Sequence, residues 1–372
     1  MTFSIDDHRH MARAIQLAWK GLYTTDPNPR VGCVLVRDGD IVGEGWHRKA
    51  GEPHAERLAI AAAGEKARGA TAYVTLEPCC HHGRTPPCTS GLLEAGVIRV
   101  IAAMEDPNPL VAGKGLEMLA EKGVEVASGL LPSDAEKLNP GFIKRMAKGL
   151  PWVRCKLAMS LDGRTAMASG ESVWITSEDA RRDVQRLRAR SSAVVTGIGT
   201  VLADDPSMNV RLSPGELPGV ETDPYFRQPL RVVLDTSLRI PEDAKLLSLE
   251  GPVQIFHSRG DADKARRLEQ TGAIITRLEG GLDLPRVMEE LAGQEVNEVL
   301  IEAGPTLAGA ALQSGIIDEL IIYVAPHLMG HRARGLFHLP GLEKMADRID
   351  LQIRDIRQVG KDFCISAVPA GE

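Results

Sequence analysis

The feature that most limits the possible folds is a regular alternation of short strand-like runs with helix-like segments. In the first half, apolar runs at 31–36, 71–76 and 97–104 alternate with helix-like segments at 54–64 and 88–95. Short apolar runs of this kind indicate buried strands, and their alternation with helices indicates βαβ units. The second half repeats the pattern, with strand-like runs at 152–160, 192–197, 230–235, 252–257, 297–304 and 319–326. The chain is therefore predicted to be α/β in both halves.

A length of 372 residues favours two domains rather than one. A polar helix is predicted over 133–149, and Gly149 followed by Pro151 is typical of a helix end. The boundary is placed there, giving domains 1–149 and 150–372. Ser4 and Asp7 have the spacing of a capping box at the start of the first helix. The segment 212–229 is rich in Pro and Gly and is predicted to be a surface loop.

Charge and hydropathy exclude several classes of protein. The net charge is −6 and the pI about 6.0, which disfavours a nucleic-acid-coating protein because such binding needs a basic face. No run of about 18 apolar residues predicts a membrane span, and the N-terminus lacks the apolar core of a signal peptide. The six cysteines are too sparse for a disulfide framework. We expect a protein of the reducing cytosol, and a small phosphorylated substrate is not excluded by the charge.

Three cysteines and two histidines crowd into thirteen positions, LEPCCHHGRTPPC (76–88). A catalytic zinc needs three protein ligands and one open position. Cys79 and Cys88 are suited to meet on one metal, because the intervening Gly and Pro residues form a loop. His54, in the sequence His-Ala-Glu, is the candidate third ligand. Zinc deaminases carry this constellation, with the glutamate, here Glu56, as acid/base rather than ligand.

The residue types fit hydrolytic deamination. Zinc makes water a nucleophile near neutral pH, and Glu56 is placed to carry the proton to departing ammonia. Two other interpretations stay open: a structural zinc site with His81 or His82 as fourth ligand, and a cysteine cluster that holds no metal. The Cys-x₈-Cys spacing also departs from the usual Cys-x-x-Cys.

Three stretches make the interpretation more specific: PNPRVGCV (27–34), HRKAGEPHAE (47–56) and TLEPCCHHGRTPPC (75–88). Together they resemble the deaminase half of the RibD family, bacterial riboflavin-biosynthesis enzymes in which a pyrimidine deaminase is fused to a reductase. The resemblance implies zinc at His54, Cys79 and Cys88, with Glu56 as proton carrier. It also implies that Asn28 and His47 face the pyrimidine and that 82–84 lies near the ribose phosphate. Asn28 could instead be a turn residue and His47 a surface residue.

The second half has a glycine turn between a strand and a helix, EAGPTLAGA (302–310), which suits an anion but also serves as a plain turn. KLAMSLDGRTA (156–166), SGESVWITS (169–177) and VLADDPSMNVR (201–211) resemble the reductase half of the same family, whose fold is like that of dihydrofolate reductase. The resemblance implies NADPH as hydride donor. The implied cofactor contacts are Ala158, Trp174, Thr200, Asp204, Thr236 and the turn Gly304, Pro305, Thr306, Leu307, Ala308, Gly309 and Ala310. The implied substrate contacts are Ser172, Arg188, Met208, Arg211 and Glu302, with Lys156 as a further candidate.

For several of these residues, the alternative is a purely structural role. Arg188 could belong to a solvated helix face, Trp174 could pack in the core, and Asp204 could be a turn residue. The favoured hypothesis is zinc-dependent removal of the 2-amino group of 2,5-diamino-6-(5-phosphoribosylamino)pyrimidin-4-one, followed by NADPH-dependent reduction of the ribosyl group to ribityl. We expect a homo-oligomer, with a dimer formed through the reductase domain. Alternatives are a deaminase of another base fused to an unrelated reductase, a zinc-stabilised nucleic-acid-binding module, and a chain in which one half is only scaffold.

Overall fold

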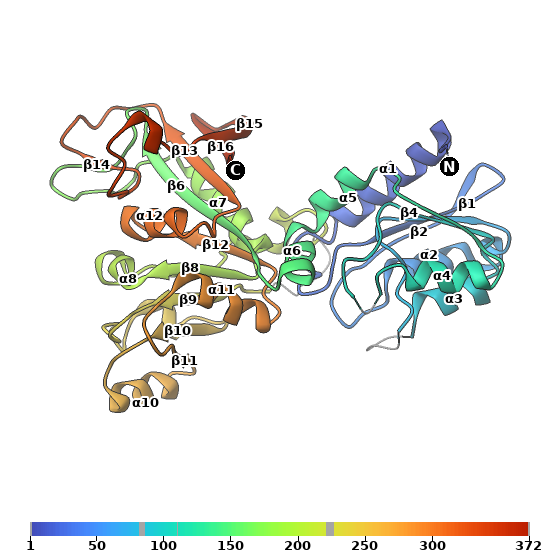
Figure 1. Cartoon of the computed structure of the whole chain (residues 1–372), viewed down its shortest axis with the longest axis horizontal. Coiled ribbons are helices and arrows are strands. Elements are labelled where there is room, and N and C mark those ends of the chain that lie inside the picture. Colours follow the sequence, from blue (N-terminus) through green and yellow to red (C-terminus); the bar gives the residue numbers. More distant parts are fainter. Residues whose placement is uncertain (1, 82–85, 110, 221–226, 371–372) are drawn as a thin grey trace. The chain divides into compact units, whose positions relative to one another are not determined.

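The computed structural model describes residues 2–81, 86–109, 111–220 and 227–370. The chain divides into two compact units. The first comprises 1–149 together with 213–226, and the second comprises 150–212 and 227–372 (Figure 1). No helix among the described residues has the length and apolar character needed to cross a bilayer.

The first unit is a five-stranded sheet in the order β2-β1-β3-β4-β5, with helices on both faces. Strands β3, β4 and β5 are parallel, and β1 is antiparallel to both β2 and β3. The strands are β1 (Gly32–Arg37), β2 (Asp40–Trp46), β3 (Thr71–Val74), β4 (Arg99–Ala102) and β5 (Glu125–Ser128). The helices are α1 (Ile5–Trp19), α2 (Ala55–Ala63), α3 (Cys88–Glu94), α4 (Lys114–Glu121), α5 (Pro132–Leu138) and α6 (Pro140–Lys148), with a 3₁₀ turn, η1 (Gly64–Ala67).

Alternation along β1 decides which helix covers which face of this sheet. Cys33 and Leu35 pack with α2, α3 and α4, whereas Val34 and Val36 pack with α1 and α5. The predicted capping box holds, since the Ser4 hydroxyl accepts from the Asp7 N–H and the Asp7 carboxylate accepts from the Ser4 N–H. Close approach fixes α2 over β2: a Cβ on Gly45 would lie 2.3 Å from the Ala55 carbonyl oxygen. This contact sets the start of α2, where the candidate site lies.

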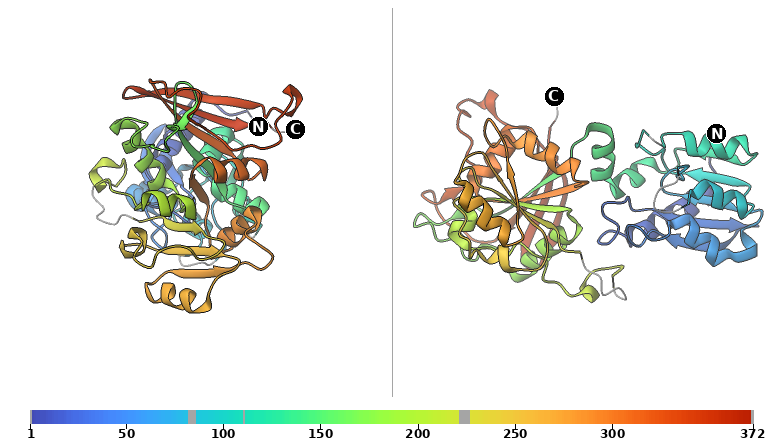
Figure 2. Two further views of the ribbon diagram at one scale, coloured as in Figure 1. Left: turned by 90° about the vertical axis from the view of Figure 1, so that its left-hand side faces the viewer. Right: turned by 90° about the horizontal axis from the view of Figure 1, so that it is seen from below.

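The second unit is a nine-stranded sheet in the order β11-β10-β9-β8-β12-β6-β13-β16-β15. Its strands are parallel from β11 to β13, and β16 and β15 continue it antiparallel. Helices α11 and α12 pack on one face and α7, α8 and α10 on the other (Figure 2). A separate two-stranded ribbon joins β7 and β14.

The strands of the second unit are β6 (Trp152–Ser160), β7 (Arg164–Ala166), β8 (Ala193–Gly197), β9 (Leu230–Leu234), β10 (Val253–His257), β11 (Ile274–Arg277), β12 (Glu298–Glu302), β13 (Glu319–Ala325), β14 (Arg334–Gly335), β15 (Leu351–Val359) and β16 (Asp362–Pro369). Its helices are α7 (Glu178–Arg190), α8 (Ile198–Asp204), α9 (Lys245–Ser248), α10 (Ala262–Gln270), α11 (Leu284–Gly293) and α12 (Pro305–Gln313).

The structure corrects two sequence expectations. The single helix predicted over 133–149 is two helices, because Pro140 starts a new helix after Asn139. The segment predicted as a surface loop over 212–229 buries Leu217 and Val220 completely, and residues 213–226 group with the first unit. Gly219 explains the close packing there, since a Cβ on it would lie 2.1 Å from the Lys20 carbonyl oxygen.

Candidate active sites

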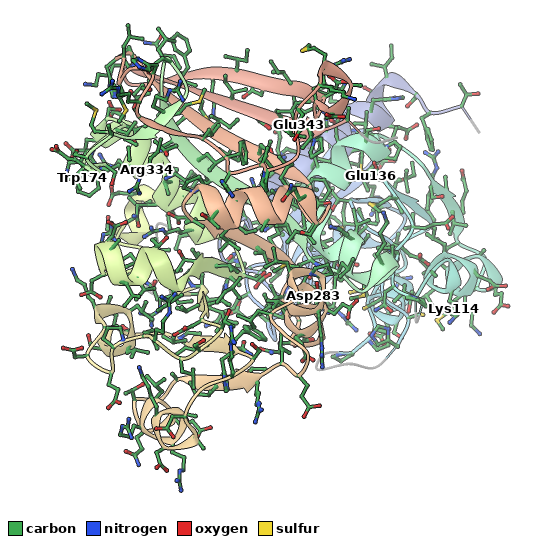
Figure 3. All side chains as sticks on the ribbon, turned by 60° about the vertical axis from the view of Figure 1, so that its left-hand side comes forward. Lys114, Glu136, Trp174, Asp283, Arg334 and Glu343 are labelled. Atoms are coloured by element: carbon green, nitrogen blue, oxygen red, sulfur yellow. The ribbon has the colours of Figure 1, made fainter. Side chains whose placement is uncertain are left out.

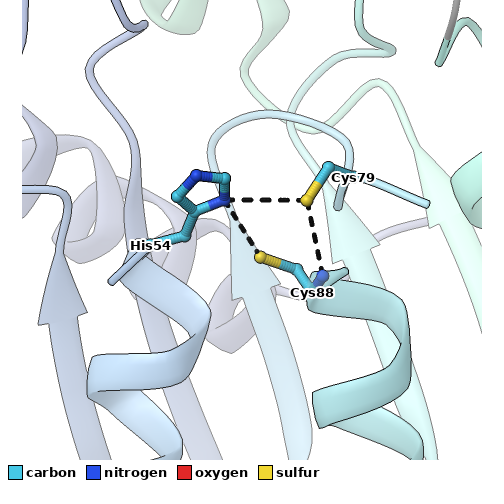
Figure 4. Close-up of side chains that lie close together, drawn as sticks. All are labelled: His54, Cys79 and Cys88. Atoms are coloured by element: carbon cyan, nitrogen blue, oxygen red, sulfur yellow. Dashed lines mark hydrogen bonds between the residues drawn. The ribbon is translucent and has the colours of Figure 1, made fainter. Parts of the chain in front are cut away.

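The candidate metal site lies where β3 leads into a loop and where two helices begin. His54 is the N-cap of α2, Cys88 is the first residue of α3, and Cys79 follows β3. The three ligand atoms lie within 4.8 Å of one another. His54 Nδ1 is 3.2 Å from Cys88 Sγ and 3.6 Å from Cys79 Sγ (Figure 4). These separations suit one tetrahedral zinc with bonds of about 2.0–2.3 Å.

Electrostatics favours a negatively charged sulfur at this place. The Cys88 backbone N–H donates to Cys79 Sγ at 3.4 Å. Hydrogen bonding from the Cys88 thiol, with help from His54, lowers the pKa of Cys79 to about 4. The hydrogen bond with Cys79 in turn raises the pKa of His54. A cation is the natural partner for such a thiolate.

Glu56 lies one residue into α2 and is 3% exposed. Burial raises the pKa of its carboxyl group, and its Oε2 atom has no hydrogen-bond partner among the described residues. An unpartnered buried carboxyl oxygen is costly unless a ligand or water completes it. The Oε2 atom is therefore available to bind a substrate or a water molecule at the metal site. The donor set of one imidazole and two sulfurs fits zinc.

Asn28 and His47 are brought together beside the metal ligands. Asn28 Nδ2 lies 3.1 Å from His47 Nε2, and His47 Nδ1 lies 3.2 Å from the Pro53 carbonyl oxygen. That oxygen only accepts, so His47 carries its proton on Nδ1 and accepts from Asn28 through Nε2. Asn28 then offers its Oδ1 as a hydrogen-bond acceptor. Burial lowers the pKa of His47 to about 4, so the ring is neutral near pH 7.

The predicted contact at 82–84 lies outside the described residues. His81 and Cys80 are described and are not members of the three-ligand group. A structural zinc site would require a fourth protein ligand, and among the described residues His81 does not fill that position.

In the second unit, four charged side chains lie close together around the end of β12 and the middle of β6. Glu302 and Lys156 are register partners on adjacent strands. Arg188 of α7 donates two hydrogen bonds to the Glu302 carboxylate, from Nε to Oε1 at 2.6 Å and from Nη2 to Oε2 at 3.0 Å. Burial opposes ionisation of Glu302, but Arg188 outweighs it and holds the pKa of Glu302 below its ordinary value. Burial lowers the pKa of Lys156, and burial together with the nearby Arg188 lowers that of Arg211.

Most of the predicted cofactor residues lie at or just after the carboxyl ends of the parallel strands. Ala158 is on β6, Thr200 and Asp204 are on α8 after β8, Thr236 follows β9, and Gly304 caps α12 after β12. The Thr196 hydroxyl donates to the Glu302 carbonyl at 2.7 Å and so ties two of these ends together. Ligands of open parallel sheets bind at this edge.

Some predicted residues have surroundings that narrow their possible roles. Within the turn, Ala308 packs in the core and Gly309 lies against the His338 backbone, whereas Pro305, Thr306, Leu307 and Ala310 are at least partly accessible. The Met208 side chain is 2% exposed and packs in the core. Ser172 is exposed, and Trp174 is 72% exposed with the Arg181 guanidinium 4.5 Å from its ring centre (Figure 3).

Sequence reasoning missed two buried acids, Glu77 and Asp106, which are 3% and 8% exposed. Glu77 stands inside the quoted TLEPC stretch, two residues before Cys79. Its position in that motif could have marked Glu77 as a candidate. Its hydrogen-bond partners, however, are backbone N–H groups between Asp106 and Leu116, far away in sequence.

Comparison with known proteins agrees with this geometry. Residues 151–365 match the family model "RibD C-terminal domain", and 4–104 match the "Cytidine and deoxycytidylate deaminase zinc-binding region". The chain is 52% identical to the riboflavin biosynthesis protein RibD of Escherichia coli K12, over 98% of this chain and 100% of that protein. It is 53% identical to the Haemophilus influenzae protein of the same name, over the full length of both.

Solved structures of similar proteins cover nearly the whole chain. A structure of Acinetobacter baumannii RibD superposes with a TM-score of 0.90 at 48% identity, covering 98% of this chain and 99% of that one. A diaminohydroxyphosphoribosylaminopyrimidine deaminase/5-amino-6-(5-phosphoribosylamino)uracil reductase from Thermotoga maritima superposes with a TM-score of 0.83 at 32% identity, with 98% and 99% coverage.

Proposed function

The chain belongs to the RibD family of riboflavin-biosynthesis enzymes, and from this premise we propose which of its residues carry each of its two activities. It is a zinc-dependent deaminase and an NADPH-dependent reductase. We assign zinc to His54, Cys79 and Cys88. The observation that carries this assignment is the convergence of one imidazole nitrogen and two sulfurs within 4.8 Å.

Zinc, when bound, supplies the Lewis acidity that makes water a nucleophile near neutral pH. Glu56 takes the proton from the attacking water on its unpartnered Oε2 and returns it to the departing amine. Asn28 Oδ1 accepts a hydrogen bond from the pyrimidine, because its amide nitrogen is held by His47. Neutral His47 fixes the Asn28 amide in that orientation without adding charge beside the zinc ligands.

NADPH, when bound, supplies the hydride that converts the ribosyl group to ribityl. We assign it to the strand-end residues: Ala158, Trp174, Thr200, Asp204, Thr236 and 304–310. Lys156, Arg188, Arg211 and Glu302 hold the phosphorylated substrate, with Ser172 and the Met208 backbone. The paired Arg188 and Glu302 orient one another, while Lys156 and Arg211 lie beside them as hydrogen-bond donors.

The Glu56→Gln variant tests the deaminase assignment. We expect it to retain about one zinc per chain and to lose deamination by roughly 10²–10⁴-fold, the range for a lost proton carrier. Reduction of pre-deaminated substrate, followed as NADPH oxidation, should be unchanged. The matched control is Glu65→Gln, an exposed position after α2. Wild-type deamination in Glu56→Gln would refute the assignment.

We further propose a dimer formed through the second unit. Ile353, Ile356 and Phe363 are 57%, 56% and 50% exposed. Register pairs Ile353 with Ala367, Ile356 with Ile365 and Gln358 with Phe363, which puts these apolar side chains on one face of the β15–β16 hairpin. An exposed apolar face at a sheet edge favours association with a second copy. Sedimentation of Ile356→Asp should show monomers, whereas Ile98→Asp, exposed to 59% in the first unit, should not change the mass.

We place the enzyme in the cytoplasm, with a small phosphorylated pyrimidine and no nucleic acid as its partner. Six free cysteines support a reducing compartment. A net charge of −6 supports the absence of nucleic-acid binding.

A further inference from the structure

Glu77 is a buried carboxylate beside the metal site that is not one of the three clustered ligands. It lies two residues before Cys79 and is 3% exposed. Burying a charged group is costly unless it is hydrogen-bonded. The hydrogen-bond partners of Glu77 therefore indicate which segments it holds in place.

Four backbone N–H groups, which we call the amide cradle, donate to this carboxylate. Oε2 accepts from Asp106 at 3.0 Å and from Gly113 at 2.8 Å. Oε1 accepts from Gly115 at 2.8 Å and from Leu116 at 3.2 Å. Each carboxylate oxygen thus receives two backbone hydrogen bonds, which satisfies both oxygens in their buried position. The charge also stands at the start of α4, where the helix dipole favours an anion.

A second contact joins the same two segments independently of the carboxylate. A Cβ added to Gly115 would lie 2.1 Å from the Pro78 carbonyl oxygen, so the first turn of α4 rests on the backbone between Glu77 and Cys79. The Glu77 N–H also donates to the Met104 carbonyl at 3.1 Å. The segment that carries Cys79 is therefore held from both its backbone and its side chain.

The amide cradle also fixes Asp106. While its N–H binds Glu77, its carboxyl accepts from the Asn108 N–H at 2.9 Å and is 8% exposed. Burial raises the pKa of this carboxyl group to about 6. The carboxylate that lies two residues before Cys79 therefore also holds the Asp106 backbone.

We propose that Glu77 is a positioning residue for deamination, which locks the Cys79 segment and the Asp106 backbone into one rigid wall of the zinc site. The inference rests on the proposed zinc site. It assigns Glu77 neither a contact with substrate nor a proton transfer, because all of its acceptor capacity toward the chain is used by the amide cradle.

Glu77→Gln tests this inference, since the amide keeps the shape but offers one acceptor oxygen and turns its NH₂ toward two N–H donors. We expect zinc to pass to a chromogenic chelator at least about tenfold faster than from wild type, because hydrogen bonds to a buried charge are lost. Deamination kcat/KM, expressed per bound zinc, should fall by a similar factor, and reduction of pre-deaminated substrate should not change. Glu121→Gln, at an exposed position on α4, is the matched control.

Wild-type zinc release and wild-type kcat and KM in Glu77→Gln would overturn the inference while leaving the zinc site intact. Wild-type protein that binds no zinc would instead overturn the proposed function. If Glu77→Gln does not fold, amide hydrogen exchange of the wild-type protein decides: the N–H groups of the amide cradle should exchange slowly. Fast exchange at Asp106 and Gly113 would refute the inference.

Discussion

The two candidate sites are built differently. In the first unit, three ligand atoms from a helix cap, a helix start and a post-strand loop meet within 4.8 Å through side chains alone. In the second unit, Arg188 and Glu302 contact each other directly, whereas the proposed cofactor residues Ala158, Thr200, Thr236 and Gly304 lie on or after four separate strands. A metal needs a few atoms at fixed distances, but a dinucleotide is long and is held by many backbone and side-chain groups along a sheet edge.

This difference predicts how each site fails. Loss of one ligand should abolish the metal site, whereas loss of one contact should only weaken the cofactor site. The two sites should also fail independently, because their proposed residues belong to different units.

The largest effect is expected for Cys79→Ala. Removing one of two sulfur ligands should abolish zinc binding and lower deamination by at least about 10³-fold, the several kcal/mol that a Lewis-acid metal supplies. Metal analysis and the two half-reactions measure this. Cys80→Ala is the adjacent control and should keep both zinc and activity. Equal losses in the two variants would contradict the ligand assignment.

Glu302→Gln should have the next largest effect, now confined to the second unit. Arg188 would remain largely buried without its charged partner, and breaking such a pair costs about 3–5 kcal/mol. We expect a lower unfolding midpoint for the reductase unit and a loss of NADPH oxidation of about 10²-fold or more. Deamination should be unchanged. An equal loss of deamination would show that the two sites are not independent.

His47 predicts a pH effect on stability. Burial puts its folded pKa near 4, below the usual value of 6.5. Between these values the unfolded chain binds the proton and the folded chain does not, so stability falls as pH falls from about 6.5 to 4. The loss is on the order of 3 kcal/mol. Urea unfolding of wild type and His47→Gln across this range should show a flatter profile for the variant; parallel profiles would contradict the explanation.

Trp174→Ala should have the smallest effect. The ring is 72% exposed and contacts Arg181, so its loss removes a stacking surface rather than core packing. Such contacts contribute about 0.5–1 kcal/mol at exposed sites. We expect KM for NADPH to rise by a few-fold, with kcat and deamination unchanged. A change in deamination, or none in KM, would remove Trp174 from the cofactor site.

The sequence predicted the fold class and family because these depend on local patterns. The α/β alternation, the deaminase-like first half and the reductase second half are confirmed. The sequence motifs and the family resemblance predicted the three metal-ligand residues, Asn28 and His47. The structure places the three ligands within 4.8 Å of one another and Asn28 within hydrogen-bond distance of His47. Their roles are proposals. Local pattern failed at Asn139, where one predicted helix is two.

Long-range contacts could not be predicted from the chain alone. The proposed role of Glu77 depends on hydrogen bonds from backbone N–H groups between Asp106 and Leu116, about 30 to 40 residues away in sequence. The β15–β16 hairpin was not predicted, because β15 is largely exposed and lacks an apolar run of the buried-strand kind. The packing of the segment around Leu217 and Val220 depends on Gly219, which faces the Lys20 carbonyl.

The central claim is a zinc held by one imidazole and two sulfurs, with a fourth position left for water. X-ray absorption at the zinc edge of the purified enzyme tests it most directly. We predict about two sulfur neighbours near 2.3 Å and about two nitrogen or oxygen neighbours near 2.0 Å, of which one is an imidazole. A third sulfur or a second imidazole around the zinc would mean a closed, structural site and would contradict the account.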